Sequence, residues 1–254
     1  MDASILQIFV AASLISAAGG ILGSFALLRR MALVGDALSH VALPGIALGL
    51  LFHFNVFLGA LAFLIFGTIV IWGVEHKTKL PVDTLVGVMF TSALAFGALI
   101  VPKEDILEAL FGDITNITVF DFWLASIIAL TIIFLLLLFS KKFTLTLISP
   151  DLSLSAGYKP HLLELLFLMI FAFAVAAGIK FTGALLMGSI IIIPAATSRN
   201  IARSMNQYIA ISAILGVVEA IAGIWLATIY NFPPGPAFVL FSSAIFFISI
   251  FLRR

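Results

Sequence analysis

The chain has 254 residues, of which 63% are hydrophobic and only 10% carry a formal charge, and its net charge is +1. Soluble globular domains carry about 25% charged residues, so this composition leaves too little polar surface for a water-soluble particle. The near-neutral charge argues against a nucleic-acid partner, and the lack of cysteine excludes disulfides and thiolate metal sites.

Charged residues and prolines separate apolar runs of about 18–25 residues, the length that crosses about 30 Å of hydrocarbon. Open strands would leave backbone groups unpaired in lipid, and barrel strands would alternate in hydropathy, so the runs are expected to be helices. The chain is therefore predicted to be an all-α transmembrane bundle of eight or nine spans in one domain, 1–254. The predicted spans are 4–28, 33–52, 56–74, 84–101, 122–139, 162–179, 183–198, 207–229 and 236–252.

The basic residues favour one orientation of this bundle. If the N-terminus lies outside and all nine spans cross, eleven of the thirteen Lys and Arg residues fall inside, and only Lys103 and Lys180 fall outside. This bias predicts a cytoplasmic C-terminus. The outer segment 102–121 carries five acidic residues against one lysine. It is either an ordinary solvated loop or a surface that attracts cations or a partner protein.

Two polar residues within the second span point to a metal pathway. Asp36 and His40 are four residues apart and share one face of a helix. An ionised Asp at mid-membrane costs about 2.5–3.5 kcal/mol, and such residues usually mark ion pathways. Carboxylate and imidazole together suit Zn, Mn or Fe. Since a closed zinc site takes about four ligands, a symmetric dimer would supply two Asp36 and two His40.

The alternative is that Asp36 pairs with Arg29 or Arg30 or caps its helix, and that His40 is a hydrogen-bonded core histidine. Pro44 and Gly45 predict a helix break just beyond His40, and breaks at membrane depth often line a pathway. Glu219 lies mid-span and is expected to face the pathway or to pair with a neighbouring helix. Close helix packing is predicted from pairs of small residues four apart: Gly19 and Gly23, Gly45 and Gly49, and Ser212 and Gly216.

The longest inner segment, 140–160, contains a predicted short helix. Ser149 suits its N-cap, Pro150 its first position and Asp151 the positive end of its dipole. Gly157 can adopt the left-handed conformation that ends a helix. This helix is either an ordinary interfacial element or the place where an ATPase acts. The chain has no G-x-x-x-x-G-K-[ST] phosphate loop, so it is not expected to be an enzyme, and any ATPase is a separate chain.

Short motifs follow one another along almost the whole chain: Gly23–Phe25, Arg29–Met31, Gly35–His40, Asp83–Gly87, Leu110–Asp113, Ser149–Leu152, Phe181–Leu186, Ile193–Thr197 and Pro233–Pro236. In the residues and order of these motifs, the chain resembles the membrane permease subunits of bacterial zinc and manganese ABC importers. Members of that family have about eight spans.

The resemblance implies a homodimeric permease in the prokaryotic cytoplasmic membrane. It also implies two ATP-binding subunits on the cytoplasmic face and an extracytoplasmic metal-binding protein. No resident cofactor is expected, only transported Zn²⁺, Mn²⁺ or Fe²⁺. The family pattern places Asp36 and His40 on the metal pathway. It places the ATPase contact in the coupling segment 149–158, which includes Ser149, Pro150, Asp151, Leu152 and Gly157.

Three other functions compete with this one. An ATP-independent secondary transporter or channel could use Asp36 and Glu219 as a proton relay. An intramembrane metalloenzyme is disfavoured because the chain has no H-E-x-x-H motif and only four histidines. A passive assembly subunit would show no metal dependence. The choice among zinc, manganese and iron stays open, because one Asp and one His suit all three.

Overall fold

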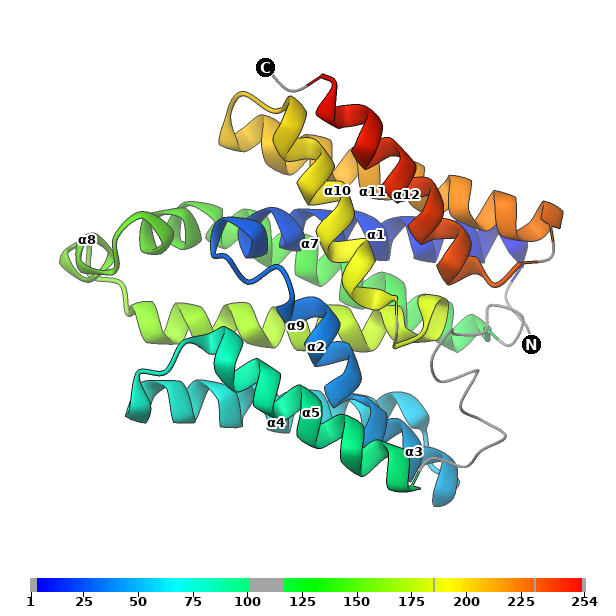
Figure 1. Cartoon of the computed structure of the whole chain (residues 1–254), viewed down its shortest axis with the longest axis horizontal. Helices are drawn as coiled ribbons and strands as arrows, with labels where there is room; N and C mark the ends of the chain where they lie inside the picture. Colours follow the sequence, from blue (N-terminus) through cyan, green and yellow to red (C-terminus); the bar gives the residue numbers. More distant parts are fainter. Residues whose placement is uncertain (1–3, 101–116, 185, 231, 253–254) are drawn as a thin grey trace.

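The computed structural model describes residues 4–100, 117–184, 186–230 and 232–252. The elements in these ranges are helices, as predicted, and Figure 1 shows them side by side in one bundle. They are α1 (Ile5–Leu28), α2 (Val34–Val41), α3 (Leu43–Leu51), α4 (Val56–Thr78), α5 (Val82–Ile100), α7 (Val119–Ile148), α8 (Pro150–Ser155), α9 (Pro160–Thr182), α10 (Met187–Ile201), α11 (Met205–Tyr230) and α12 (Pro234–Ile250).

In the part of the chain that the structure describes, six segments are long and apolar enough to cross a membrane: α1, α2 with α3, α4, α7, α9 and α11. Two shorter apolar helices, within α5 and α12, add to these. Helices of this length and composition are expected in a multi-pass membrane protein. The predicted count of eight or nine spans is compatible with this architecture.

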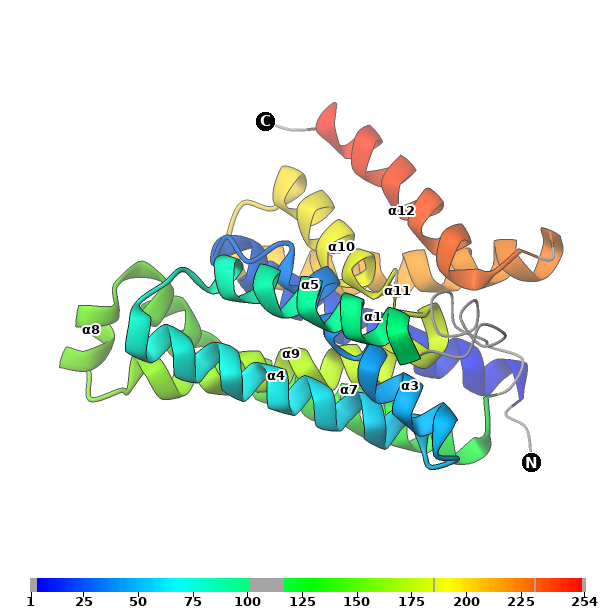
Figure 2. The same cartoon turned by 60° about the horizontal axis from the view of Figure 1, so that its bottom comes forward.

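The centre of the bundle is α1, which packs against α7, α9, α10 and α11. Figure 2 shows α4 and α5 on one side of the bundle and α12 on the other. Small residues let the backbones meet: a side chain at Gly23 would collide with the Ile191 carbonyl, and one at Gly20 with the Ser212 carbonyl. Gly45 and Gly59 meet in the same way between α3 and α4. The predicted role of the small-residue pairs in helix packing is therefore confirmed.

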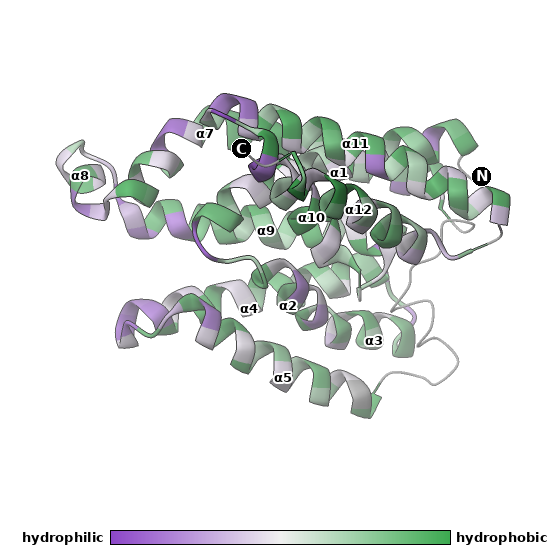
Figure 3. Cartoon of the chain, turned by 45° about the horizontal axis from the view of Figure 1, so that its top comes forward, coloured by the Kyte–Doolittle hydropathy of each residue, from purple (hydrophilic) through white to green (hydrophobic). Residues whose placement is uncertain are grey.

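The connections between helices gather at two opposite ends of the bundle. Figure 1 places the α1–α2, α4–α5 and α10–α11 connections toward the end that carries α8, and we call this the α8 end (residues 29–33, 78–82, 148–160 and 201–205). The N-terminus and the α3–α4 and α11–α12 connections lie at the other end. Figure 3 shows hydrophilic residues at the α8 end and mostly apolar helices between the ends. The described segments that were predicted to lie inside therefore share one end of the bundle. Which side of the membrane this end faces stays a prediction.

The second predicted span is two helices rather than one. The predicted break is present, but it falls at Ala42, between α2 and α3. Proline has no N–H to donate to the carbonyl four residues earlier, so Pro44 cannot continue α2 and instead lies in the first turn of α3. The predicted span 183–198 also differs, because α10 begins only at Met187 and follows Gly183, whose φ is 77°.

The predicted end of the span 122–139 was wrong, because much of the segment 140–160 belongs to the same helix. Helix α7 continues through Lys141 and Lys142 to Ile148, and α8 follows after Ser149 alone. The ammonium of Lys142 lies 4.7 Å from the ring centre of Phe139 and 5.3 Å from that of Tyr158. Long basic side chains can lie along apolar surface and keep their charge at its edge, so two lysines need not end a membrane helix.

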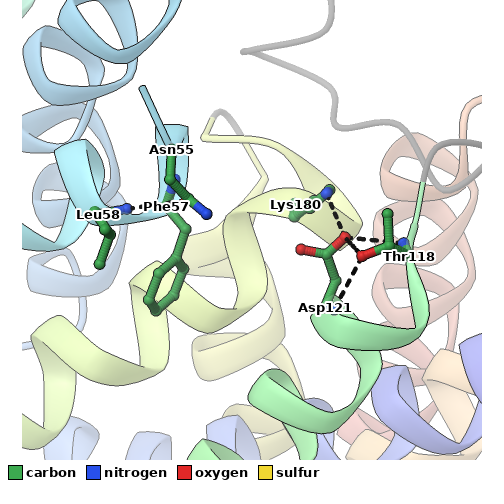
Figure 4. A network of polar contacts seen from close by, with 6 residues as sticks. All are labelled: Asn55, Phe57, Leu58, Thr118, Asp121 and Lys180. Carbon is green, nitrogen blue, oxygen red and sulfur yellow. Dashed lines mark hydrogen bonds and ion pairs between the residues drawn. The ribbon is translucent and has the colours of Figure 1, made fainter. Parts of the chain in front are cut away.

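An ion pair joins α7 to α9 at the end opposite α8. Lys180 donates to the Asp121 carboxylate at 2.6 Å, and Thr118 and Asp121 cap the start of α7 reciprocally. Figure 4 shows Asp121 between Lys180 and Thr118, with Asn55 capping α4 nearby. Asp121 is the last residue of the acidic segment 102–121, of which residues 102–116 lie outside the described residues. Its charge is already paired, so it adds little to any attraction of cations.

This geometry predicts unequal effects of removing the two partners. Asp121→Ala removes the ion pair and the hydrogen bonds that the Asp121 carboxylate accepts from Thr118, and it should lower the free energy of unfolding by about 1–2 kcal/mol. Lys180→Met removes only a pair whose lysine is 44% exposed and should cost less than about 1 kcal/mol. Unfolding by denaturant in detergent micelles measures both. A larger loss of unfolding free energy for Lys180→Met than for Asp121→Ala would contradict this arrangement of Lys180, Asp121 and Thr118.

Candidate metal-binding site

Helix α2 holds Asp36 and His40 at an otherwise buried position. Its neighbours are α5, α10, α9 and α4. Asp36 is half-buried, whereas His40 is only 7% exposed. One helical turn separates them, as their spacing predicts, so both side chains belong to one stretch of the helix. The structure therefore places the predicted pair inside the bundle, with the carboxylate at its edge.

The first turn of α10 packs directly against Asp36. A side-chain carbon at Gly188 would lie 2.7 Å from the Cα and Cβ atoms of Asp36 and 2.8 Å from its nitrogen. Only glycine permits this approach, because real Cβ atoms do not tolerate such distances. The Gly188 contact therefore places the first turn of α10 against the backbone and Cβ atom of Asp36.

A buried serine ties α2 to the link between α9 and α10. The Ser39 hydroxyl lies within hydrogen-bonding distance of two carbonyl oxygens, one of Asp36 and one of Ala184. Gly35, one residue before Asp36, meets Ile191 and Phe171 in the same region. These contacts fix the rotation of α2, and with it the direction in which Asp36 points.

His40 has an unpartnered nitrogen. Its ring meets the Phe90 ring of α5 edge-on, with centroids 5.0 Å apart and planes 72° apart. Its Nδ1 atom is buried and finds no hydrogen-bond partner in the described part of the chain. Buried polar atoms are nearly always hydrogen-bonded. The expected partner of an ordinary core histidine is missing, so the atom is available to a ligand.

The alternative interpretation of Asp36 is that its carboxylate forms an ion pair with Arg29 or Arg30. Arg29 instead reaches α9, where its guanidinium lies 3.6 Å from the Glu164 carboxylate and 4.8 Å from the ring centre of Phe167. Burial lowers the pKa of Arg29, and the carboxylates of Glu164 and Glu75 oppose that shift. Neither of the ion pairs found in the described ranges involves Asp36. The carboxylate is therefore not held by the arginine pair.

Within the described residues, one chain brings two candidate ligands to this position. No group of three His, Asp or Glu residues that could hold a metal occurs within residues 4–100, 117–184, 186–230 and 232–252. Glu219 does not complete the site: it lies on α11, which packs against α1, α10 and α12. Glu219 is fully buried, and neither carboxylate oxygen has a partner among the described residues. Whether it acts in transport stays a prediction.

The predicted short helix at the α8 end has the predicted local structure. Ser149 caps α8 by accepting the Leu152 N–H at 3.2 Å, Pro150 opens the helix, and Gly157 follows it with φ 81°. Ser153 is buried and hydrogen-bonds Thr146 of α7 at 2.9 Å. Leu152 and Leu154 are 53% and 56% exposed. The helix is thus anchored through one face and presents leucines on another.

Sequence reasoning missed the partners of α2. Gly188, Phe90 and Ala184 come from distant parts of the chain, and no spacing links them to Asp36. The only available signal was the glycine at 188, two residues before the apolar run Ile190–Ile193. A glycine in such a place suggests a close approach, but it does not name the partner.

These features define a class, the multi-pass membrane permease, with a polar pair on a broken helix. The sequence model of the ABC 3 transport family matches residues 1–253, and the chain belongs to that family.

Two curated relatives and one solved structure are similar over most of their length. The manganese transport system membrane protein MntC of Listeria monocytogenes is 31% identical over 234 residues, covering 91% of this chain and 84% of the relative. The high-affinity zinc uptake system membrane protein ZnuB of Haemophilus influenzae is 32% identical over 239 residues, covering 92% and 91%. The structure of PsaBC from Streptococcus pneumoniae in complex with Fab superposes with a TM-score of 0.86 and 26% identity, covering 97% and 91%.

The contact between α10 and Asp36 predicts a specific sensitivity to side-chain volume. Gly188→Ala should lower the free energy of unfolding by about 1–3 kcal/mol, the usual cost of overpacking. Gly73→Ala is the matched control, because a side chain at Gly73 of α4 meets nothing within 4 Å. It should be neutral or stabilising, since alanine favours a helix. Denaturant unfolding measures both variants. Equal stability of the two would contradict the close contact between Gly188 and Asp36.

Proposed function

We propose that this chain is the permease subunit of an ATP-driven importer. It moves a divalent transition metal (zinc, manganese or iron) across the prokaryotic cytoplasmic membrane. The single observation that carries the proposal is the buried His40, with an unpartnered Nδ1 one helical turn from Asp36 on a broken membrane helix. The names of the relatives, which are manganese and zinc transport proteins, support the same class of cargo.

The metal site is proposed to form between two copies of the chain. Asp36 remains half-exposed on a helix whose other residues near it are mostly buried, so its carboxylate faces outward. In Figure 1 the short helices α2 and α10 lie together on the near face, across the longer helices. A second copy on that face would bring a second Asp36 and His40, giving four ligands of the kind that Zn²⁺ or Mn²⁺ accepts.

Two further partners complete the proposed machine. An extracytoplasmic metal-binding protein delivers the ion at the end opposite α8. Two separate ATP-binding subunits engage the coupling segment 149–158 at the α8 end. The exposed Leu152 and Leu154 favour this contact, because apolar side chains in a short capped helix offer a rigid docking surface. ATP-driven movement of α8 would reach the bundle through Ser153 and α7.

An ATP-independent secondary transporter is the alternative. Its proton relay needs Asp36 and Glu219 close together, but the two lie on helices with largely different neighbours. Helix α2 packs against α5, α10 and α9, whereas α11 packs against α1, α10 and α12. This separation favours the ATP-driven importer.

The site assignment predicts loss of transport when either ligand is removed. Liposomes that contain the chain with its ATPase and binding protein should take up Zn²⁺ or Mn²⁺ only with ATP. Loss of a partner that merely orients a ligand costs 10–100-fold in affinity, so His40→Ala or Asp36→Ala should lower uptake at least about tenfold. His53→Ala, in the exposed α3–α4 turn, is the control and should transport normally. Normal uptake by the Asp36→Ala/His40→Ala double variant refutes the site, and uptake without ATP refutes the importer.

The coupling role of α8 predicts a separable defect. Leu152→Ser with Leu154→Ser should leave the fold intact, because both side chains are exposed, but weaken the complex with the ATPase about tenfold or more. Leu58→Ser, at a similarly exposed leucine in the first turn of α4 at the opposite end of the bundle, is the control. Co-purification and metal-stimulated ATP hydrolysis measure the effect. An unchanged complex would show that the ATPase binds elsewhere.

A further inference from the structure

Two histidines from distant parts of the chain meet at the α8 end. His76, in the last turn of α4, and His161, in the first turn of α9, have ring centroids 5.8 Å apart and planes 39° apart. Both residues are exposed. Neither was predicted from the sequence to have a special role. Their rings come together because α4 packs against α9 along its length.

A tryptophan holds this pair in place. Trp72 donates its indole Nε1–H to the His161 carbonyl at 2.9 Å, which fixes the start of α9 against α4. The same indole stacks on the His76 ring, with centroids 6.2 Å and planes 13° apart. Each histidine thus has its own contact with one rigid aromatic side chain. The approach of the two rings is therefore a feature of the helix packing.

The surroundings of the pair favour a cation. Glu164 lies three residues after His161, on the same face of α9, and Glu75 directly precedes His76. Arg29 interacts electrostatically with both carboxylates, and only Glu164 forms an ion pair with it. Two carboxyl groups that share one buried arginine therefore lie beside the two exposed imidazoles.

We propose that His76 and His161 form a second transition-metal site, separate from Asp36 and His40. Imidazole suits Zn²⁺ and similar ions, and Zn–N bonds of about 2.0–2.1 Å allow two rings on one ion to have centroids about 5–6 Å apart. No third His, Asp or Glu is already placed around the same point in the described chain, so water completes the coordination. Mg²⁺ requires oxygen ligands, so this pair of imidazoles should not bind it.

The site also has a mechanical consequence. One ligand comes from α4 and the other from α9, so a bound ion ties the ends of these two helices together. Helix α9 begins only a few residues after α8. An ion at this position therefore restrains the segment next to the proposed ATPase contact. Only the identity of the ion is taken from the proposed function, because the pair itself rests on contacts within one chain.

The test uses the full chain in detergent micelles, freed of any polyhistidine tag and carrying Asp36→Ala/His40→Ala to remove the first site. Zn²⁺ at about a hundredfold excess over its Kd should raise the unfolding temperature by about 5 °C or more. Adding His76→Ala or His161→Ala should abolish most of this shift and weaken Zn²⁺ binding at least about tenfold. Adding His53→Ala is the matched control and should change neither.

Two further measurements keep the result decisive. Without metal, the His76→Ala and His161→Ala chains should unfold within about 2 °C of their parent, because both side chains are exposed. Mg²⁺ should give no shift. The proposal is overturned if the Zn²⁺ shift survives in the His76→Ala/His161→Ala chain, or if Mg²⁺ gives an equal shift. Failure of the first site would appear instead as normal uptake by the Asp36→Ala/His40→Ala transporter, so the two failures are distinguishable.

Discussion

The backbone contact of α1 with α10 and α11 is the constraint on which the rest of this structure depends. In lipid there is little hydrophobic force between helices, so close packing must supply the stability. Glycines on α1 allow the approach to α10 and α11, and Gly216 of α11 meets the Ser16 carbonyl in return. With α1 fixed in the centre, the positions of α10 and α11 follow. Helix α10 lies against Asp36, and α11 carries the buried Glu219.

Helix α10 transmits this constraint to the candidate site. At Ile191 its backbone touches Gly23 of α1, and one turn earlier Gly188 touches Asp36 of α2. The same short helix therefore contacts the centre of the bundle and the backbone of Asp36. Movement of α10 relative to α1 would shift Asp36 directly, without any intermediate loop. A metal ligand positioned by a packed helix is held more precisely than one positioned by a loop.

The sequence predicted the parts of this arrangement that are local. Apolar runs identified the helices, the spacing of Asp36 and His40 placed them on one face, and Ser149, Pro150 and Gly157 defined a short helix with its caps. It failed where lysines were taken to end a membrane helix, because Lys142 can lie over Phe139 and Tyr158 without leaving α7. It also could not predict that Gly188, Ala184 and Phe90 surround α2, since such contacts depend on tertiary packing.

Under the proposed function, the distribution of the candidate ligands accounts for how the chain would conduct an ion rather than store it. A closed site of four ligands within one chain would bind tightly and release slowly, which suits a structural metal and not a cargo. Here each chain offers Asp36 and His40 on α2, with one histidine nitrogen left unpartnered. In the proposed homodimer, affinity would depend on how closely the two copies approach along the face formed by α2 and α10. A small change in that approach, driven from the proposed ATPase contact at α8, would convert a four-ligand site into two two-ligand sites that release the ion.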